Sequence, residues 1–203
     1  MTIRKGEAWG APGALPADGV LVHSDAQARE VVTEARRRGD PIPTLGLLGG
    51  DLCRTLGGKG DVERLRSADA MTFPVDLGAA LVDGHLHWFV AHLVARRSWW
   101  FGRVIAVMNA QWHGRWDLGP RSHPDDGLLD ITDATMALGD RWKAWRRLPT
   151  GTHLPHPSLR TTRTAAATFD LEPALTVHLD GRAVGRARTL AVRIEPDALT
   201  VVV

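Results

Sequence analysis

The chain has 203 residues, of which 44% are hydrophobic and 24% charged, and its formal net charge is +2. This composition is typical of a folded globular protein and excludes an intrinsically disordered one. No apolar run reaches the roughly 18 residues that a membrane-spanning helix needs, and the first ten residues lack the apolar core of a secretory signal. Because Cys53 is the single cysteine, no intrachain disulfide can form. We therefore expect a cytoplasmic protein.

The first 68 residues predict a small α/β unit. Residues 1–19, rich in Gly, Pro and Ala, predict a loose lead-in, and residues 19–24 predict a short strand. A helix should follow over Ser24–Arg38, because serine is a good N-cap, apolar residues recur at helical spacing and a glycine follows the last basic residue. An apolar stretch then leads into a glycine-rich turn. Strand, helix, strand and glycine loop are typical of the start of an α/β domain.

From residue 69 onward the pattern changes to short strands separated by Asp-Gly and Gly, which indicates a β-sandwich or barrel. Asp83-Gly84 and Asp180-Gly181 are favoured hairpin turns. One helix is expected within residues 135–148, where four apolar residues share a face: Leu138, Trp142, Trp145 and Leu148. We place the domain boundary near residue 68, giving domains 1–68 and 69–203.

Two Asp-Gly motifs carry the first candidate chemistry. Asp125, Asp126 and Asp130 flank a glycine, and hard divalent cations such as Mg²⁺ prefer the carboxylate and carbonyl oxygens that such a turn offers. The alternative is an aspartate-rich turn with solvated carboxylates. Asp180 could act as a general base at a strand end, or could simply form a hairpin turn. The residues alone leave both alternatives open.

Glycines and histidines supply two weaker candidates. The loop Gly49, Gly50 and Asp51 could bind phosphate, since glycines allow backbone N–H groups to approach an anion, but it lacks the Lys-Ser/Thr of a P-loop. His85 and His87 fall on one face of a strand and could bind a metal, although no third ligand is evident in the sequence. The alternative for the two histidines is a solvated strand face.

Tryptophan and arginine occur together in residues 94–103 and 141–148. Such clusters suit a lipid or membrane surface, at which the protein would lie peripherally. The alternative is tryptophan packed in the core with arginine at its rim. We do not expect nucleic-acid binding, because nothing beyond the composition of these clusters supports it.

Four segments between about residue 72 and the end resemble one family. They are VIAVMNAQWHGRWDLGPRSHPDDGLLDI at 104–131, LPTGTHLPHPSLRTTR at 148–163, LTVHLDGRA at 175–183 and TLAVRIEPDALTVVV at 189–203. Their order and spacing are similar to those of diacylglycerol kinase and sphingosine kinase catalytic domains, in the bacterial YegS-like branch. NAD kinase, which shares the fold, is a more distant match.

The resemblance implies a fold, an activity and site residues. The fold would be that of NAD kinases and diacylglycerol kinases, with an α/β nucleotide domain, here reduced to a remnant, followed by a β-sandwich. The activity would be ATP- and Mg²⁺-dependent phosphorylation of a lipid hydroxyl. Asp126 matches the aspartate that ligates Mg²⁺, Leu128 falls where a backbone carbonyl completes that site, and Asp180 matches the general base. The two Asp-Gly motifs would then form one linked site.

The chain departs from the family pattern in several ways. It is shorter than a complete member, the signature GGDGT is missing, and LLGGDLCRTLGG at 47–58 fits a later family segment, which places Gly49, Gly50 and Asp51 near phosphate. Arg182 replaces the glutamate of the family's DGE, where it would favour ionised Asp180 or bind phosphate directly. These departures favour an alternative: a catalytically degenerate member that binds lipid or nucleotide as a regulator or partner subunit. A homo-oligomer, or another chain supplying the missing half, would fit either alternative.

Overall fold

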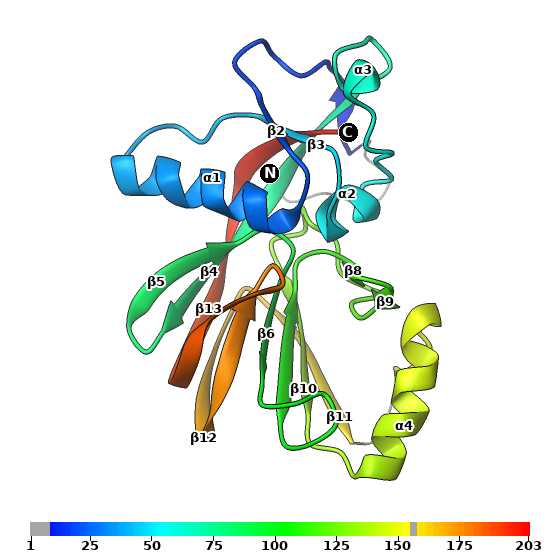
Figure 1. Cartoon of the computed structure of the whole chain (residues 1–203), viewed down its shortest axis with the longest axis vertical. Helices are drawn as coiled ribbons and strands as arrows, with labels where there is room; N and C mark the ends of the chain where they lie inside the picture. Colours follow the sequence, from blue (N-terminus) through cyan, green and yellow to red (C-terminus); the bar gives the residue numbers. More distant parts are fainter. Residues whose placement is uncertain (1–8, 155–157) are drawn as a thin grey trace.

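The computed structural model describes residues 9–154 and 158–203, so the first eight residues of the predicted lead-in, 1–19, lie outside the described part. The N-terminal part is a small α/β layer at one end of the molecule (Figure 1). Its elements in chain order are β1 (Ala11–Pro12), β2 (Val20–Val22), α1 (Asp25–Arg38), β3 (Leu45–Leu47), α2 (Asp51–Thr55) and α3 (Val62–Leu65).

The predicted helix over Ser24–Arg38 is confirmed, together with both of its caps. The Ser24 hydroxyl accepts the backbone N–H of Gln27 at 3.3 Å, and the Gln27 side chain accepts the backbone N–H of His23 at 2.7 Å. Gly39 ends the helix with φ of 74°, a left-handed conformation that glycine adopts without steric cost. The cap at Ser24 fixes the start of α1, and with it the position of Asp25.

The rest of the chain is mostly β-structure, as predicted. Its strands are β4 (Met71–Val82), β5 (His85–Phe89), β6 (His92–Arg96), β7 (Val104–Met108), β8 (Trp112–His113), β9 (Trp116–Asp117), β10 (Leu129–Ala134), β11 (Leu159–Thr164), β12 (Ala166–Leu179) and β13 (Arg182–Val202). The helical elements are α4 (Leu138–Arg147) and the short 3₁₀ helix η1 (Leu148–Thr150). Both predicted Asp-Gly hairpins are present, between β4 and β5 and between β12 and β13.

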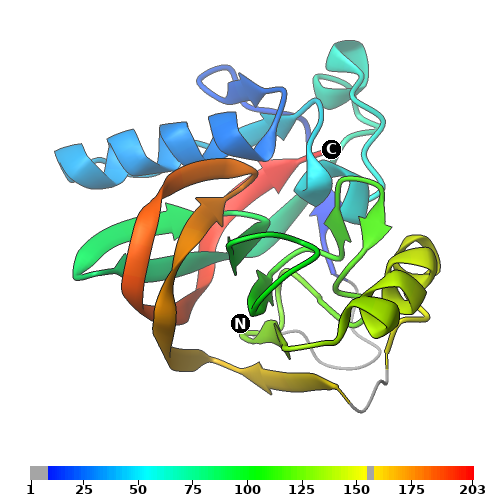
Figure 2. The same ribbon diagram turned by 60° about the horizontal axis from the view of Figure 1, so that its bottom comes forward.

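One sheet in the order β1-β4-β13-β12-β6-β7-β10-β11 connects most of these strands, and β5 pairs with β4; β8 and β9 form a separate two-stranded sheet. One buried cluster contains Phe89 of β5, Ile131 of β10 and Leu190 of β13, although several strands separate β4 from β10 along the sheet. The sheet must therefore bend over on itself to enclose this core. Register shifts within β12 and β13 accompany the curvature of these strands (Figure 2).

The last residues of β13 return to the N-terminal part of the molecule. Val201 and Val202 pair in parallel with β3, while β13 also pairs antiparallel with β4. A second buried cluster joins Leu45 and Leu52 with Phe73 and Val201. Residues on both sides of position 68 thus contribute to one hydrophobic cluster.

Helix α4 packs only partly against the sheet. Trp145 and Leu148 belong to a third cluster on the outer face of β6, β7 and β10, whereas Leu138 and Trp142 are 55% and 57% exposed. The buried Arg141 guanidinium anchors the helix by donating to the carbonyls of Trp99 and Met136, both at 3.0 Å, and of Gly102. Within the described ranges, none of the helices is long and apolar enough to cross a membrane.

Candidate functional site

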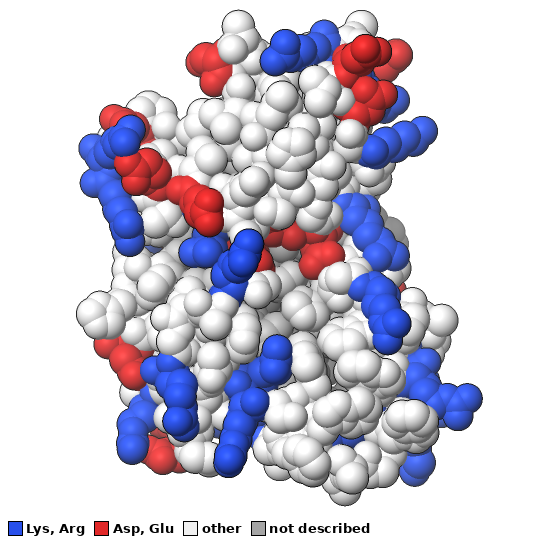
Figure 3. All heavy atoms as spheres, in the orientation of Figure 1, with Lys and Arg blue, Asp and Glu red and all other residues white. Residues whose placement is uncertain are grey.

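A polar cavity of about 420 Å³ lies where the N-terminal part meets the β-structure. The starts of α1, α2 and β6, the β8–β9 hairpin and the β12–β13 turn all contribute to its wall. Acidic side chains gather in the hollow between α1 and β8 on the face drawn in Figure 3. Its ionisable lining residues are Asp25, Asp51, His92, His113, Arg115 and Asp180.

Asp180 forms the base of this cavity. It occupies the β12–β13 turn with φ of 48°, and its side chain is fully buried. Its carboxylate accepts the backbone N–H groups of Val90, Ala91 and His92 at 3.0, 2.9 and 3.1 Å, and the Arg29 Nε lies 4.0 Å away. Burial raises the pKa of Asp180 above its ordinary value. The charge of His92 and the three N–H donors lower this pKa, but less than burial raises it. The carboxylate therefore holds the β5–β6 turn and exposes no surface to a substrate.

Arg182 does not share the surroundings of Asp180. Asp180 and Gly181 form the turn between β12 and β13, so they do not pair with either strand. Residues 180 and 182 therefore do not lie on the same face of one regular strand. Arg182 is exposed and is not part of the cavity lining, and the guanidinium beside Asp180 is that of Arg29 on α1. The expectation that Arg182 would lie next to Asp180 is therefore corrected.

The loop Gly49, Gly50 and Asp51 reaches the polar cavity through Asp51, but a carboxylate of α1 occupies the N–H groups at the end of this loop. The Asp25 carboxylate accepts the N–H of Asp51 at 2.6 Å and that of Leu52 at 3.1 Å. A Cβ on Gly50 would lie 2.5 Å from Asp25 Oδ1, and one on Gly49 would lie 2.7 Å from the His23 carbonyl oxygen. The glycines thus allow the loop to pack against the start of α1, with Asp25 in the position that an anion would take. Burial, followed by the charge of Asp180, raises the pKa of Asp25 to about 6.

Sequence reasoning missed the cluster formed by Asp51, His92 and His113. The His92 Nε2 lies 2.9 Å from Asp51 Oδ2 and 3.1 Å from His113 Nδ1. Burial and the neighbouring His92 lower the pKa of His113 to about 4, so its ring is neutral at physiological pH. No sequence signal could have identified this cluster, because the three residues come from separate segments and His92 lies in an apolar strand pattern.

Asp126 and Leu128 lie outside the polar cavity. Asp126 Oδ2 pairs with the Arg163 guanidinium, and Oδ1 accepts the Leu128 N–H at 2.9 Å. Both carboxylate oxygens have partners, one of them a cation, so these residues do not fit an Mg²⁺ site as they stand. The neighbouring Gly127 donates its N–H to Asp76 Oδ2 at 2.7 Å.

Hydrogen bonds, rather than a shared cavity, connect the two Asp-Gly motifs. The Asn109 side-chain amide donates to the carbonyls of Asp76 and Val90, both at 2.8 Å, and Val90 in turn donates to Asp180. Asp76 and Asn109 are buried structural residues that the sequence did not single out. For the pair His85 and His87, no third metal-ligating side chain joins them within residues 9–154 and 158–203.

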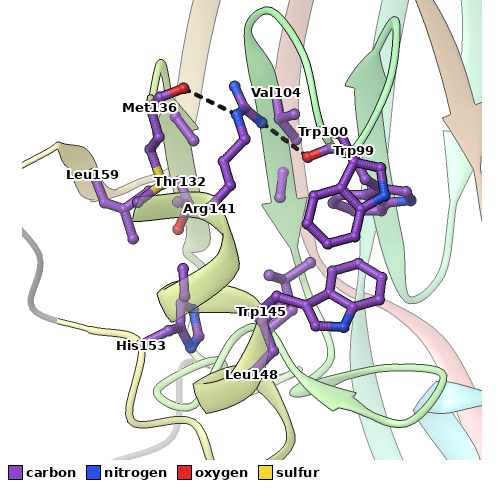
Figure 4. Close-up of a pocket in the computed structure, with 14 residues that line it drawn as sticks. Trp99, Trp100, Val104, Thr132, Met136, Arg141, Trp145, Leu148, His153 and Leu159 are labelled. Atoms are coloured by element: carbon purple, nitrogen blue, oxygen red, sulfur yellow. Dashed lines mark hydrogen bonds between the residues drawn. The ribbon is translucent and has the colours of Figure 1, made fainter. Parts of the chain in front are cut away.

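A second, apolar cavity of about 70 Å³ lies between α4 and the outer face of the sheet (Figure 4). Trp100, Val104, Met136, Trp145 and Leu148 are among its lining residues. Trp99 lines both this apolar cavity and the polar cavity, so the two are adjacent.

An exposed apolar surface continues from the apolar cavity through Trp100. This exposed patch consists of Trp100, Phe101, Leu138 and Trp142, together with Gly139. Phe101 is 64% exposed, and with Leu138 and Trp142 it accounts for three of the six large hydrophobic side chains exposed in the described residues. Such a contiguous apolar surface is typical of an interaction site.

Comparisons with known proteins agree with this architecture. Three solved structures from Bacillus anthracis str. Sterne share the fold. Two are described as a putative diacylglycerol kinase, with TM-scores of 0.69 and 0.67 at 16% and 15% identity, and both comparisons cover 91% of this chain and 77% of the other. The third, a diacylglycerol kinase, has a TM-score of 0.62 at 16% identity, with 91% and 75% covered. The fold is therefore the NAD kinase-like one that diacylglycerol kinases share.

Among curated proteins, none matches the chain. A family model, the YegS C-terminal NAD kinase beta sandwich-like domain, matches residues 81–203, which is more than half of the chain. The chain belongs to this YegS-like family.

Proposed function

We propose that this protein binds a neutral lipid alcohol, such as a diacylglycerol, with an acyl chain in the apolar cavity and the hydroxyl-bearing head in the polar cavity. The observation that carries the proposal is that Trp99 lines both cavities. A lipid has the same division into an apolar and a polar part. The structural relatives are described as diacylglycerol kinases, which supports the choice of lipid.

The apolar cavity suits an acyl chain because its wall is almost entirely hydrocarbon and aromatic. Burying a CH₂ group stabilises a complex by about 0.8 kcal/mol, so a few carbons beneath α4 would contribute several kcal/mol. Arg141 at its edge donates to three carbonyls, which leaves its guanidinium committed to holding α4 in place.

The polar cavity suits a hydroxyl group better than a phosphate. Three aspartates, Asp25, Asp51 and Asp180, line this cavity, and their negative charge would repel an unneutralised phosphate. The partly exposed Asp51 carboxylate can accept a hydrogen bond from a hydroxyl, and the neutral His113 ring lies next to it. We therefore expect a neutral lipid to bind more tightly than its phosphorylated counterpart.

The exposed patch would give a lipid access to the apolar cavity from a membrane surface. Phe101 and Trp142 can enter the interfacial region of a bilayer, where tryptophan is favoured. The protein would then lie peripherally on the membrane while it takes up its ligand.

A second candidate function is ATP-dependent phosphorylation of the same hydroxyl, with Asp180 as general base and Mg²⁺ at the phosphates. The position of Asp180 at the base of the polar cavity favours it. Against it, the Asp180 carboxylate is fully buried, and Asp25 occupies the N–H groups of Asp51 and Leu52 at the end of the glycine loop. We therefore favour binding without phosphoryl transfer.

Calorimetric titration with a water-soluble short-chain diacylglycerol tests the proposal. Ala144→Leu should weaken binding at least tenfold while leaving thermal stability equal or higher, because leucine fills the apolar cavity and is nearly as good a helix former as alanine. Lys143→Leu adds the same side chain on the exposed face of α4 and should leave affinity unchanged. Equal affinity in Ala144→Leu and the wild type would contradict the proposal. Phosphorylated lipid formed from ATP and Mg²⁺ would instead establish the second candidate.

A further inference from the structure

We propose that Asp51, His92 and His113 form a binding site for a divalent transition metal of the Zn²⁺ type. The site goes beyond lipid binding and does not depend on it. Its three ligand atoms would be Asp51 Oδ2, His92 Nε2 and His113 Nδ1, from α2, β6 and β8.

The distances within the cluster are close to those that coordination needs. The three ligand atoms all lie within 4.8 Å of one another. The His92 Nε2 is 2.9 Å from the carboxylate and 3.1 Å from the second imidazole. Zn–N and Zn–O bonds of about 2.0–2.2 Å in a tetrahedron place ligand atoms about 3.3 Å apart. A small outward movement of the side chains would therefore admit an ion.

Backbone hydrogen bonds hold two of the three ligand residues, Asp51 and His92, in position. The Gly114 N–H lies 2.9 Å from both Asp51 oxygens, and the Asp51 N–H donates to Asp25. The His92 backbone exchanges hydrogen bonds with Asp180, whose N–H donates to the His92 carbonyl at 2.9 Å. Such outer contacts orient ligands and are part of a functional metal site.

The donor set selects the class of metal. Two imidazoles and one carboxylate suit Zn²⁺, Co²⁺ or Ni²⁺, whereas Mg²⁺ prefers oxygen ligands alone. The nearby carboxylates of Asp25 and Asp180 add negative charge that favours any cation.

Three protein ligands leave a fourth position open, as in catalytic rather than structural zinc sites. All three residues line the polar cavity, so that position would face it and take a water molecule or an oxygen atom of a ligand. The site would then supply a Lewis acid next to the proposed lipid head group.

Titration with Co²⁺ in the absence of lipid tests the site directly, because four-coordinate Co²⁺ absorbs visible light. The wild-type protein should bind one equivalent of Co²⁺, and Zn²⁺ but not Mg²⁺ should displace it. His113→Ala and the near-isosteric Asp51→Asn should each weaken binding at least ~100-fold, since loss of an outer partner alone typically costs 10–100-fold. Thermal unfolding of each variant without metal shows whether it is folded.

The double variant His85→Ala/His87→Ala is the matched control, because it removes two histidines from β5, outside the cluster. It should keep the wild-type stoichiometry and affinity. Loss of the Co²⁺ spectrum in this control, or an unchanged Co²⁺ affinity in folded His113→Ala, would overturn the proposal. The absence of Co²⁺ binding to the wild type would overturn it as well.

Discussion

Replacing Asp180 by alanine should destabilise the protein whether or not the residue takes part in catalysis. The substitution leaves the buried N–H groups of Val90, Ala91 and His92 without their acceptor. A buried donor left unsatisfied costs about 1–3 kcal/mol. Water from the adjacent polar cavity can reach part of this turn, so we take the lower end for each donor, and expect a loss of about 3 kcal/mol in the free energy of unfolding. For a chain of this size that corresponds to a decrease of about 6–12 °C in Tm.

Chemical denaturation and calorimetry of Asp180→Ala would measure this loss, with Asp83→Ala as the matched control. Asp83 occupies the other Asp-Gly turn with φ of 46° and accepts the backbone N–H groups of Arg188 and Thr189, but it is exposed to water. Solvent can replace its hydrogen bonds, so its loss should be clearly smaller. Equal losses in the two variants, or a loss below about 1 kcal/mol for Asp180→Ala, would refute the structural role that the three N–H contacts assign to Asp180.

Three further predictions concern other parts of the molecule. Burial, followed by the charge of Asp76, raises the pKa of Asp125 to about 6, so its native state loses stability as pH rises from about 4 to 6. Asp125→Asn should therefore be more stable than the wild type at pH 7, by about 1–2 kcal/mol after discounting for solvent screening, and nearly equal at pH 4; equal urea midpoints at both pH values would contradict this. Gly50→Ala should lower Tm, because φ is 99° and the new Cβ would lie 2.5 Å from an Asp25 oxygen; an unchanged Tm would show that the loop can relax. The double variant Phe101→Ser/Trp142→Ser should reduce sedimentation with anionic vesicles at least tenfold with no decrease in Tm, and wild-type sedimentation would exclude the exposed patch as a membrane contact.

Local patterns predicted the elements of the fold well because their causes are local. Helix α1 follows from its serine and glycine caps, and the two Asp-Gly hairpins follow from the left-handed φ angles that such turns require. The bending of the sheet and the return of β13 to β3 were not predictable in this way. They depend on contacts between residues that lie far apart in the chain.

The candidate site was only partly predictable for the same reason. Asp180 and Asp51 were identified from their turns, and the structure brings them to one cavity. The partners that decide their chemistry come from elsewhere: Asp25 from the start of α1 and His92 from an apolar strand. Arg182 was expected on the same strand face as Asp180 because the two are two positions apart. That rule holds only within a regular strand, and the chain turns between these two residues.

The most direct test of lipid binding is a crystal structure of the protein with a short-chain diacylglycerol. We predict electron density for an acyl chain beneath α4, between Trp145 and the sheet, and for the glycerol hydroxyl in the polar cavity beside Asp51. Trp99 should lie between the two parts of the ligand. A lipid bound elsewhere, with both cavities unchanged, would contradict the account.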